Sequence, residues 1–154
     1  MIRAAAVALC FPLTAAPVFA GCAEDVVTVK GEWGQARFRI ELADDAEERA
    51  RGLMFVEDMP VMDGMLFIYE APRRATFWMR NTLIPLDMIF AGPDGVVRHV
   101  HENAVPLDET TIDGGDGVLA VLEINGGLAS RLGIGAGDVL QHPAFGADAV
   151  LPCE

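Results

Sequence analysis

The stretch Phe77–Phe90, FWMRNTLIPLDMIF, holds the residues of this chain best suited to recognise a ligand. It contains the aromatic ring of Trp78, the cation of Arg80, the amide of Asn81 and the carboxylate of Asp87. Successive side chains of a strand point to opposite faces, so two strands paired as a hairpin would place Trp78, Arg80 and Asp87 on one side. We therefore predict an Arg80–Asp87 pair. It is either a structural ion pair beside a packed Trp78 or the wall of a ligand pocket that also uses Asn81.

A second group of residues could hold a soft metal ion. Six of the seven methionines fall between residues 54 and 88, and His99 and His101 would share one face of a strand. Thioether and imidazole ligands suit copper, and Met59, Met62, His99 and His101 are the donors that such a site would use. The alternative is that the methionines fill irregular gaps in the core while the two histidines face solvent. We adopt this alternative and predict no metal and no cofactor.

The sequence lacks the residue patterns that most forms of covalent catalysis use. Ser130 is the only serine, and its Leu-Ala-Ser-Arg-Leu surroundings are not those of a nucleophile elbow. Lys30 is the only lysine and falls in a predicted strand, which disfavours covalent chemistry through an amine. No glycine-rich phosphate loop follows a strand and opens a helix. Acid–base catalysis by carboxylates stays open, because 23 acidic residues offer many pairs.

Residues 1–20 form a predicted secretory signal. Arg3 is their only charge, an apolar run follows, and Val18-Phe19-Ala20 is a small-x-small cleavage site. The run is shorter than the roughly 20 apolar residues that span a membrane, and no later stretch qualifies. We therefore predict a periplasmic or secreted protein with no transmembrane span after cleavage. The alternative is a lipid anchor at Cys22, because Phe19-Ala20-Gly21-Cys22 resembles a bacterial lipobox, although leucine is usual at the first position.

Two cysteines remain once this signal is removed, and they lie almost at the two ends of the chain. Disulfides persist in the oxidising compartments that exported proteins reach, and the termini of a domain often lie close together. We predict a disulfide between Cys22 and Cys153. Two unrelated surface thiols are the alternative.

The composition predicts one folded, acidic domain over residues 21–154. The net charge is −12, and it becomes −13 when Arg3 is removed with the signal. Such a surface repels nucleic acid and anionic lipid, so we predict no nucleic-acid partner. With 52% apolar residues the chain is able to fold, and its length suits one ordinary domain.

Short strands dominate the elements that must position these residues. The apolar patterns predict strands over residues 26–30, 36–42, 64–69, 86–91, 96–101, 118–124 and 138–141. Helices are predicted over 44–51, capped by Asp44 and ended by Gly52, and over 127–132, ended by Gly133. Many short strands with one or two short helices indicate a β-dominated α+β domain with a small curled or barrel-like, mostly antiparallel sheet.

Four motifs occur in an order that resembles one known family. They are Arg51-Gly52-Leu53-Met54, Gly64-Met65-Leu66-Phe67, Phe77-Trp78-Met79-Arg80-Asn81-Thr82 and Ile84-Pro85-Leu86-Asp87, and Leu122-Glu123 and Gly137-Asp138-Val139 continue the pattern. From about Phe38 to Val139 the chain resembles the domain-of-unknown-function 192 family, with Arg80 where lysine is common. The resemblance implies a compact β-rich fold, often exported, and implies no mechanism.

Together these features predict an exported, non-catalytic envelope protein that binds an unknown small molecule or an envelope protein. Its expected ligand-binding residues are Trp78, Arg80, Asn81 and Asp87. A periplasmic copper-handling protein and a carboxylate-based enzyme are the two alternative functions. A pocket with convergent carboxylates of raised pKa would favour the enzyme.

Overall fold

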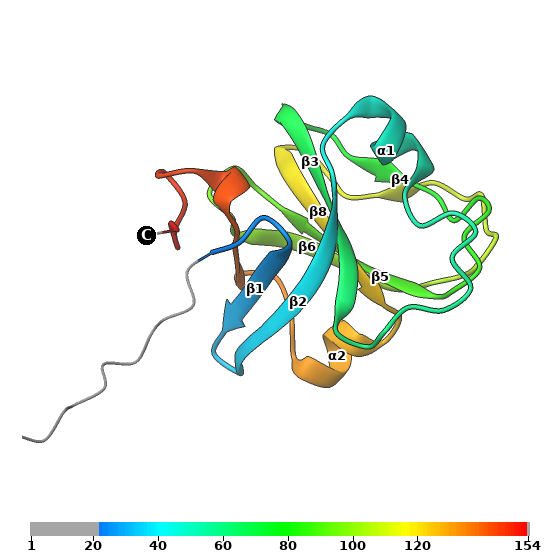
Figure 1. Ribbon diagram of the computed structural model, residues 1–154, viewed down its shortest axis with the longest axis horizontal. Helices are drawn as coiled ribbons and strands as arrows, with labels where there is room; N and C mark the ends of the chain where they lie inside the picture. The colour runs from blue at the N-terminus through cyan, green and yellow to red at the C-terminus, as the bar shows by residue number, and fades with distance from the viewer. Residues whose placement is uncertain (1–21, 154) are drawn as a thin grey trace, which may run out of the picture.

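A curled sheet of seven strands forms the body of the protein in a computed structural model that describes residues 22–153 (Figure 1). The strand order is β6-β5-β8-β3-β2-β1-β9, and a second, two-stranded sheet joins β4 to β7. The elements are β1 (Val26–Gly31), β2 (Gly34–Ala43), α1 (Ala46–Arg51), β3 (Asp63–Arg73), β4 (Thr76–Phe77), β5 (Leu86–Ala91), β6 (Val97–Ala104), β7 (Ile112–Asp113), β8 (Val118–Asn125), α2 (Leu128–Leu132), β9 (Val139–Gln141) and the 3₁₀ turn Pro143–Phe145.

The predicted fold class is confirmed, because the sheet is β-dominated, curls into a half-barrel and carries two short helices. Neighbouring strands are antiparallel except for β2 and β3, which run parallel. A parallel pair needs a crossover connection, and α1 lies in that crossover. The helix is capped by Asp45, whose Oδ1 accepts hydrogen bonds from the N–H groups of Glu47 and Glu48 at 2.8 Å. The predicted cap, Asp44, is therefore wrong by one residue.

β5 and β8 lie inside the sheet and are covered on both faces, which explains their almost continuous apolar sequences. Each of these strands nevertheless contains one carboxylate, Asp87 in β5 and Glu123 in β8. Met88 is the partner of Glu123 in the strand pairing, and Asp87 is the partner of Ile124. Because side chains alternate along a strand, Asp87 and Glu123 point to opposite faces of the sheet.

A separate hydrophobic cluster covers each face. The face of Asp87 packs against α2, and its largest buried side chains are Phe38, Leu66, Ile89, Leu122, Ile124 and Leu140. The face of Glu123 is buried by Phe67, Met79, Leu86, Met88 and Phe90.

The segment after β4 does not form the predicted hairpin with β5. Both edges of β5 are occupied, by β6 and by β8, so the strand has no free edge for Phe77–Arg80. Residues 78–85 instead form a loop, in which Asn81 adopts a left-handed φ of 56°. Backbone hydrogen bonds hold this loop to its neighbours. The N–H of Phe55 donates to the carbonyl of Asn81 at 2.8 Å, and the N–H of Leu107 donates to the carbonyl of Thr82 at 3.1 Å.

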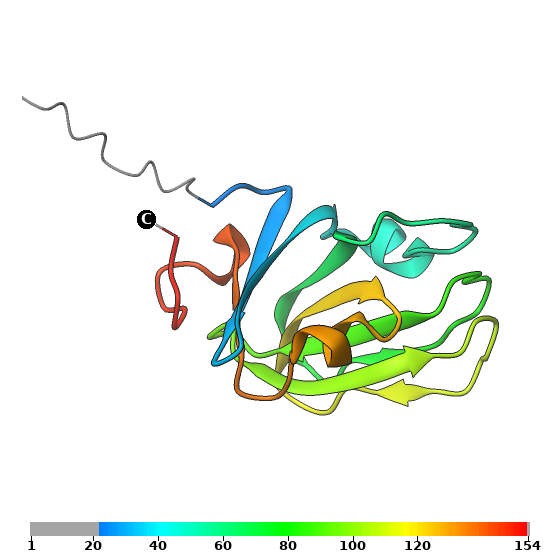
Figure 2. The same ribbon diagram turned by 90° about the horizontal axis from the view of Figure 1, so that it is seen from below.

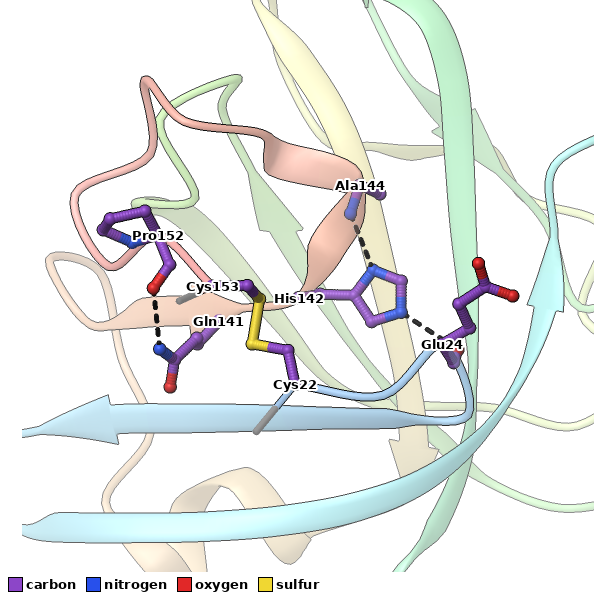
Figure 3. Close-up of a disulfide and its surroundings, with 7 residues drawn as sticks. All are labelled: Cys22, Glu24, Gln141, His142, Ala144, Pro152 and Cys153. Carbon is purple, nitrogen blue, oxygen red and sulfur yellow. Dashed lines mark hydrogen bonds between the residues drawn. A yellow bond between two sulfur atoms is a disulfide. The ribbon is translucent and has the colours of Figure 1, made fainter. Parts of the chain in front are cut away.

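Cys22 and Cys153 join the two ends of the described chain in a disulfide, as predicted (Figure 3). Their Cα atoms lie 5.6 Å apart although 131 positions separate them in the sequence. Beside the bridge, Gln141 donates to the carbonyl of Pro152 at 3.1 Å. Both ends lie at the opposite end of the molecule from residues 78–85 (Figure 1 and Figure 2).

The predicted signal and its cleavage site fall in residues 1–21, outside the described part of the chain. Between residues 22 and 153, no helix has the length and hydrophobicity needed to cross a membrane.

Candidate functional site

A pocket of about 220 Å³ opens on the face of the sheet that carries Glu123. Its walls come from the end of α1 and the turn after it, from β3, and from the segment that follows β4. The lining residues are Arg49, Ala50, Arg51, Gly52, Leu53, Met54, Phe67, Tyr69, Thr76, Phe77, Trp78, Arg80, Thr82 and Glu123. Aromatic and aliphatic walls with a few convergent polar groups are typical of small-molecule sites.

Glu123 distinguishes this pocket from the rest of the surface. Its side chain is only 4% exposed and lies between Met65 of β3 and Met88 of β5. Within residues 22–153, its carboxyl group forms no hydrogen bond or ion pair. Desolvation by burial is the cause of the shift in its pKa. No fully buried side-chain oxygen of the described chain lacks a hydrogen-bond partner. The carboxyl oxygens of Glu123 therefore keep a small contact with solvent, which we assign to the pocket that this residue lines.

Burial raises the pKa of Glu123 to about 8. The cause is desolvation, which disfavours the charged form of a carboxyl group. At neutral pH the group is therefore mostly protonated, so that it can donate one hydrogen bond and accept others. A strongly perturbed carboxyl group in a cleft is a common mark of a functional site.

Three arginines surround the pocket, and they differ in how firmly they are held. Arg49 is 14% exposed; it pairs with Glu70 at 2.7 Å, donates to the carbonyl of Ile68 at 2.8 Å, and lies over the ring of Tyr69 at 5.5 Å. Arg51 and Arg80 are exposed, and neither belongs to the ion pairs formed by the described residues. These two guanidinium groups are available to a ligand.

Two of the four predicted ligand-binding residues lie together at this pocket. The guanidinium of Arg80 lies over the ring of Trp78 at 5.4 Å, and both residues line the cavity. Trp78 is 45% exposed, so much of its ring still faces solvent. Asn81 is not among the lining residues. Its amide lies 3.8 Å from the sulfur of Met54, and Met54 does line the pocket. Asn81 therefore supports the wall of the pocket.

Asp87 has a structural role on the opposite face of the sheet. Its Oδ1 accepts hydrogen bonds from the N–H groups of Asn103 and Gly127, and its Oδ2 accepts one from Ala129, each at 2.8 Å. Gly127, the N-cap of α2, has no side chain to satisfy the first turn, and Asp87 does so from the neighbouring strand. The predicted Arg80–Asp87 pair is wrong, because these backbone groups occupy the carboxylate.

Comparison with known proteins places the chain in a family. Residues 26–142 match the sequence family DUF192, which is described as "Uncharacterized ACR". The chain belongs to the domain-of-unknown-function 192 family. No curated protein matches the sequence.

Two crystal structures resemble this member of the family. A protein of unknown function from Novosphingobium aromaticivorans DSM 12444 is 50% identical, with a TM-score of 0.74 over 81% of this chain and 89% of that one. A candidate transcription regulator from Sinorhizobium meliloti 1021 is 40% identical, with a TM-score of 0.76 over 81% of this chain and 98% of that one.

The residues that the copper alternative requires are spread over the family fold. His99 and His101 lie on β6 opposite Phe90 and Met88, and His99 stacks on Phe90 with a centroid distance of 5.7 Å. Met59 and Met62 lie in the connection that leads into β3, which is separated from β6 by β5 and β8. Over residues 22–153, no three His, Cys, Asp or Glu side chains are grouped closely enough to hold a metal ion.

Glu123 is not among the predicted site residues, although the sequence contains a signal for it. The run Val-Leu-Ala-Val-Leu-Glu-Ile from Val118 to Ile124 has apolar residues on both faces of the predicted strand. Such a pattern is typical of a strand buried on both sides, so its one carboxylate had to be buried as well. Arg49 gave no comparable signal, because a basic residue near the end of a helix is common.

Proposed function

We propose that this member of the domain-of-unknown-function 192 family is exported and binds a small organic molecule in the pocket lined by Glu123. The observation that supports the proposal is the carboxyl group of Glu123, a residue only 4% exposed, which has no hydrogen-bond or ion-pair partner within residues 22–153 and lines a cavity of about 220 Å³. A ligand that enters this cavity and forms a hydrogen bond with Glu123 would replace a contact with solvent by a direct one, and a net hydrogen bond of this kind contributes about 0.5–1.5 kcal/mol.

Binding explains the pocket better than catalysis by a pair of carboxylates does. Glycoside hydrolysis, for example, needs two carboxyl groups roughly 5–10 Å apart. Among the described residues that line the pocket, Glu123 is the only aspartate or glutamate. The pocket therefore supplies one carboxyl group and, among the described residues, no second one to work with it.

The disulfide supports export. Structural disulfides are typical of oxidising compartments outside the cytosol, and the bridge between Cys22 and Cys153 spans almost the whole described chain. A bridged Cys22 also has no free thiol for the lipid of a lipoprotein. The disulfide therefore favours a periplasmic or secreted protein over one anchored by a lipid at Cys22.

The description of the Sinorhizobium meliloti protein raises DNA binding as another function. Affinity for DNA depends on lysine and arginine side chains that neutralise phosphates. This chain has 11 such residues against 23 acidic ones, and the resulting net charge of −12 repels DNA. We therefore do not extend that description to this protein.

A fragment screen followed by NMR tests the binding proposal. We expect some members of a panel of small organic molecules to shift the amide signals of Gly52, Thr82 and Glu123 in the ¹⁵N-labelled protein. Glu123→Leu should abolish these shifts, whereas Glu32→Leu, at an exposed position in the turn between β1 and β2, should keep them. A panel that never shifts these signals would contradict the proposal.

Intact mass spectrometry of the protein from its natural host, without reduction, tests export. The expected mass is that of residues 21–154 less two hydrogens, for cleavage after Ala20 and one disulfide. A mass that includes the signal or a diacylglycerol group would contradict this assignment.

A further inference from the structure

We infer that the ligand is a small organic anion whose negative group pairs with Arg51 and Arg80 at the mouth of the pocket and accepts a hydrogen bond from Glu123. The inference rests on the proposed function, because it names the class of molecule that the same pocket would bind.

Positive charge is concentrated at this pocket. The protein as a whole has a net charge of −12, yet three of its eleven lysine and arginine residues line this one pocket. Arg49 is held by Glu70 and the ring of Tyr69, whereas Arg51 and Arg80 have no ion-pair partner in the described chain. A guanidinium group offers several N–H donors in a plane that matches a carboxylate. The mouth of the pocket is therefore complementary to an anion.

The protonation state of Glu123 also favours an anion. Its surroundings include Arg49 and Arg51 from α1, Tyr69 from β3 and Arg80 from the segment after β4. In the sheet, Glu41 of β2 is the pairing partner of Met65, and His101 of β6 is the pairing partner of Met88, so both lie one strand further from Glu123. Despite these neighbours, burial dominates and raises the pKa of Glu123 to about 8, so the group is mostly neutral at pH 7. A neutral carboxyl group does not repel an anion, and it can donate a hydrogen bond to the ligand.

A cationic ligand fits the same residues poorly. It would need Glu123 to ionise in its buried position, and it would meet the guanidinium groups of Arg51 and Arg80 at the entrance. The two ligand classes therefore predict opposite pH dependences. An anion should bind better below pH 8, while Glu123 carries its proton, and a cation should bind better above pH 8, after the proton has left.

The size and walls of the pocket limit the rest of the ligand. A cavity of about 220 Å³ has the volume of about seven water molecules, at about 30 Å³ each in the liquid. The rings of Phe67 and Phe77, which meet edge to face at 5.2 Å, and the side chain of Leu53 supply apolar walls. An acid with one aromatic ring or a short alkyl chain has the matching shape and chemistry.

Three probes of similar shape and different charge test the inference on the purified protein. They are phenylacetate, an anion, 2-phenylethanol, which is neutral, and 2-phenylethylamine, a cation. We expect NMR titrations at pH 6 to show phenylacetate binding at least tenfold more tightly than the other two. At pH 9 its affinity should fall about tenfold, because about nine-tenths of Glu123 would then be ionised for a pKa of about 8.

Two variants connect the binding to the named residues. Glu123→Gln keeps a hydrogen-bond donor and cannot ionise, so its affinity for phenylacetate should be the same at pH 6 and pH 9. Arg80→Gln should weaken phenylacetate at least fivefold at pH 6 and leave 2-phenylethanol unchanged. Arg37→Gln, on the exposed side of β2, is the matched control and should change neither affinity.

The outcomes separate the two levels of the proposal. If 2-phenylethylamine or 2-phenylethanol binds most tightly and shifts the pocket signals, the anion inference is overturned while the binding pocket stands. If phenylacetate binds equally well to Arg80→Gln and keeps its pH dependence in Glu123→Gln, the anion inference is also overturned. If neither the three probes nor the fragment panel shifts the signals of Gly52, Thr82 and Glu123, both proposals fail.

Discussion

Asp87 and Glu123 are buried carboxyl groups on neighbouring strands, and the protein uses them in opposite ways. Asp87 is 0% exposed, and its two oxygens accept three backbone hydrogen bonds. Glu123 is 4% exposed and has no such partner in the described part of the chain, and its burial holds it largely protonated at neutral pH. Burial by itself therefore does not assign a role to a carboxyl group. The role depends on which groups the covering elements bring to it.

The covering elements differ between the two faces of the sheet. Over Asp87, the turn into α2 and the end of β6 bring backbone N–H groups, which leave the carboxylate fully occupied. Over Glu123, α1 and the segment after β4 bring rings and guanidinium side chains around a cavity. One arrangement stabilises the fold, and the other leaves a polar group free to meet a ligand.

Removing the carboxylate of Asp87 should produce the largest effect. Asp87→Ala leaves the buried N–H of Ala129 and the partly buried N–H groups of Asn103 and Gly127 without their acceptor, and an unsatisfied group costs up to about 1–3 kcal/mol when it is buried. We expect the free energy of unfolding, measured by urea denaturation, to fall by about 5 kcal/mol. Asp87→Asn, which keeps one oxygen acceptor, should lose less. A loss below 1 kcal/mol for Asp87→Ala would show that the comparison assigns the wrong role to this residue.

Replacing the ionisable carboxyl group of Glu123 should change the free energy of unfolding in the opposite direction. The folded state holds a proton on Glu123 up to a pKa of about 8, whereas the unfolded chain releases it near 4.5. The stabilisation from this proton is complete below pH 4.5 and is lost as the pH rises toward 8, by about 1.4 kcal/mol per pH unit. Glu123→Gln, which cannot ionise, should therefore be more stable than the natural protein by about 3 kcal/mol at pH 7.

The pH dependence of this difference provides the control. The two proteins should have similar stabilities at pH 4.5, and the gap in unfolding free energy should widen toward pH 8. Glu32→Gln, at an exposed position, should track the natural protein throughout. A constant gap between pH 4.5 and pH 8 would mean that desolvation of Glu123 is not its source.

The seven strands of the large sheet and the disulfide were accessible from the sequence because they depend on local patterns and on a small number of cysteines, whereas the two-residue strands β4 and β7 were not predicted. The site was accessible only in part. Trp78 and Arg80, two of the four predicted ligand-binding residues, both line the pocket, but Arg80 was predicted to pair with Asp87, whose oxygens are occupied by backbone N–H groups. The error arose because β8 occupies the edge of β5 where a hairpin partner was expected, and β8 begins 27 residues after β5 ends. Glu123 is buried for the same reason. Because β8 lies between β3 and β5 in the sheet, Glu123 lies between Met65 and Met88.

The smallest expected effect belongs to Arg80, and it separates the two carboxylates directly. Arg80 is exposed and stacks on Trp78 at 5.4 Å, and it has no contact with the occupied oxygens of Asp87. An exposed cation–π contact contributes about 0.5–1 kcal/mol, so Arg80→Gln should lower the free energy of unfolding by no more than that. In a double-mutant cycle with Asp87→Asn, the two losses should add to within about 0.5 kcal/mol, as they do for residues that share no partner. In a cycle with Trp78→Ala, the loss caused by Arg80→Gln should instead disappear, because the ring that it stacks on is gone. Coupling of more than 1 kcal/mol between Arg80 and Asp87 would restore the ion pair predicted from the sequence and would remove Arg80 from the pocket.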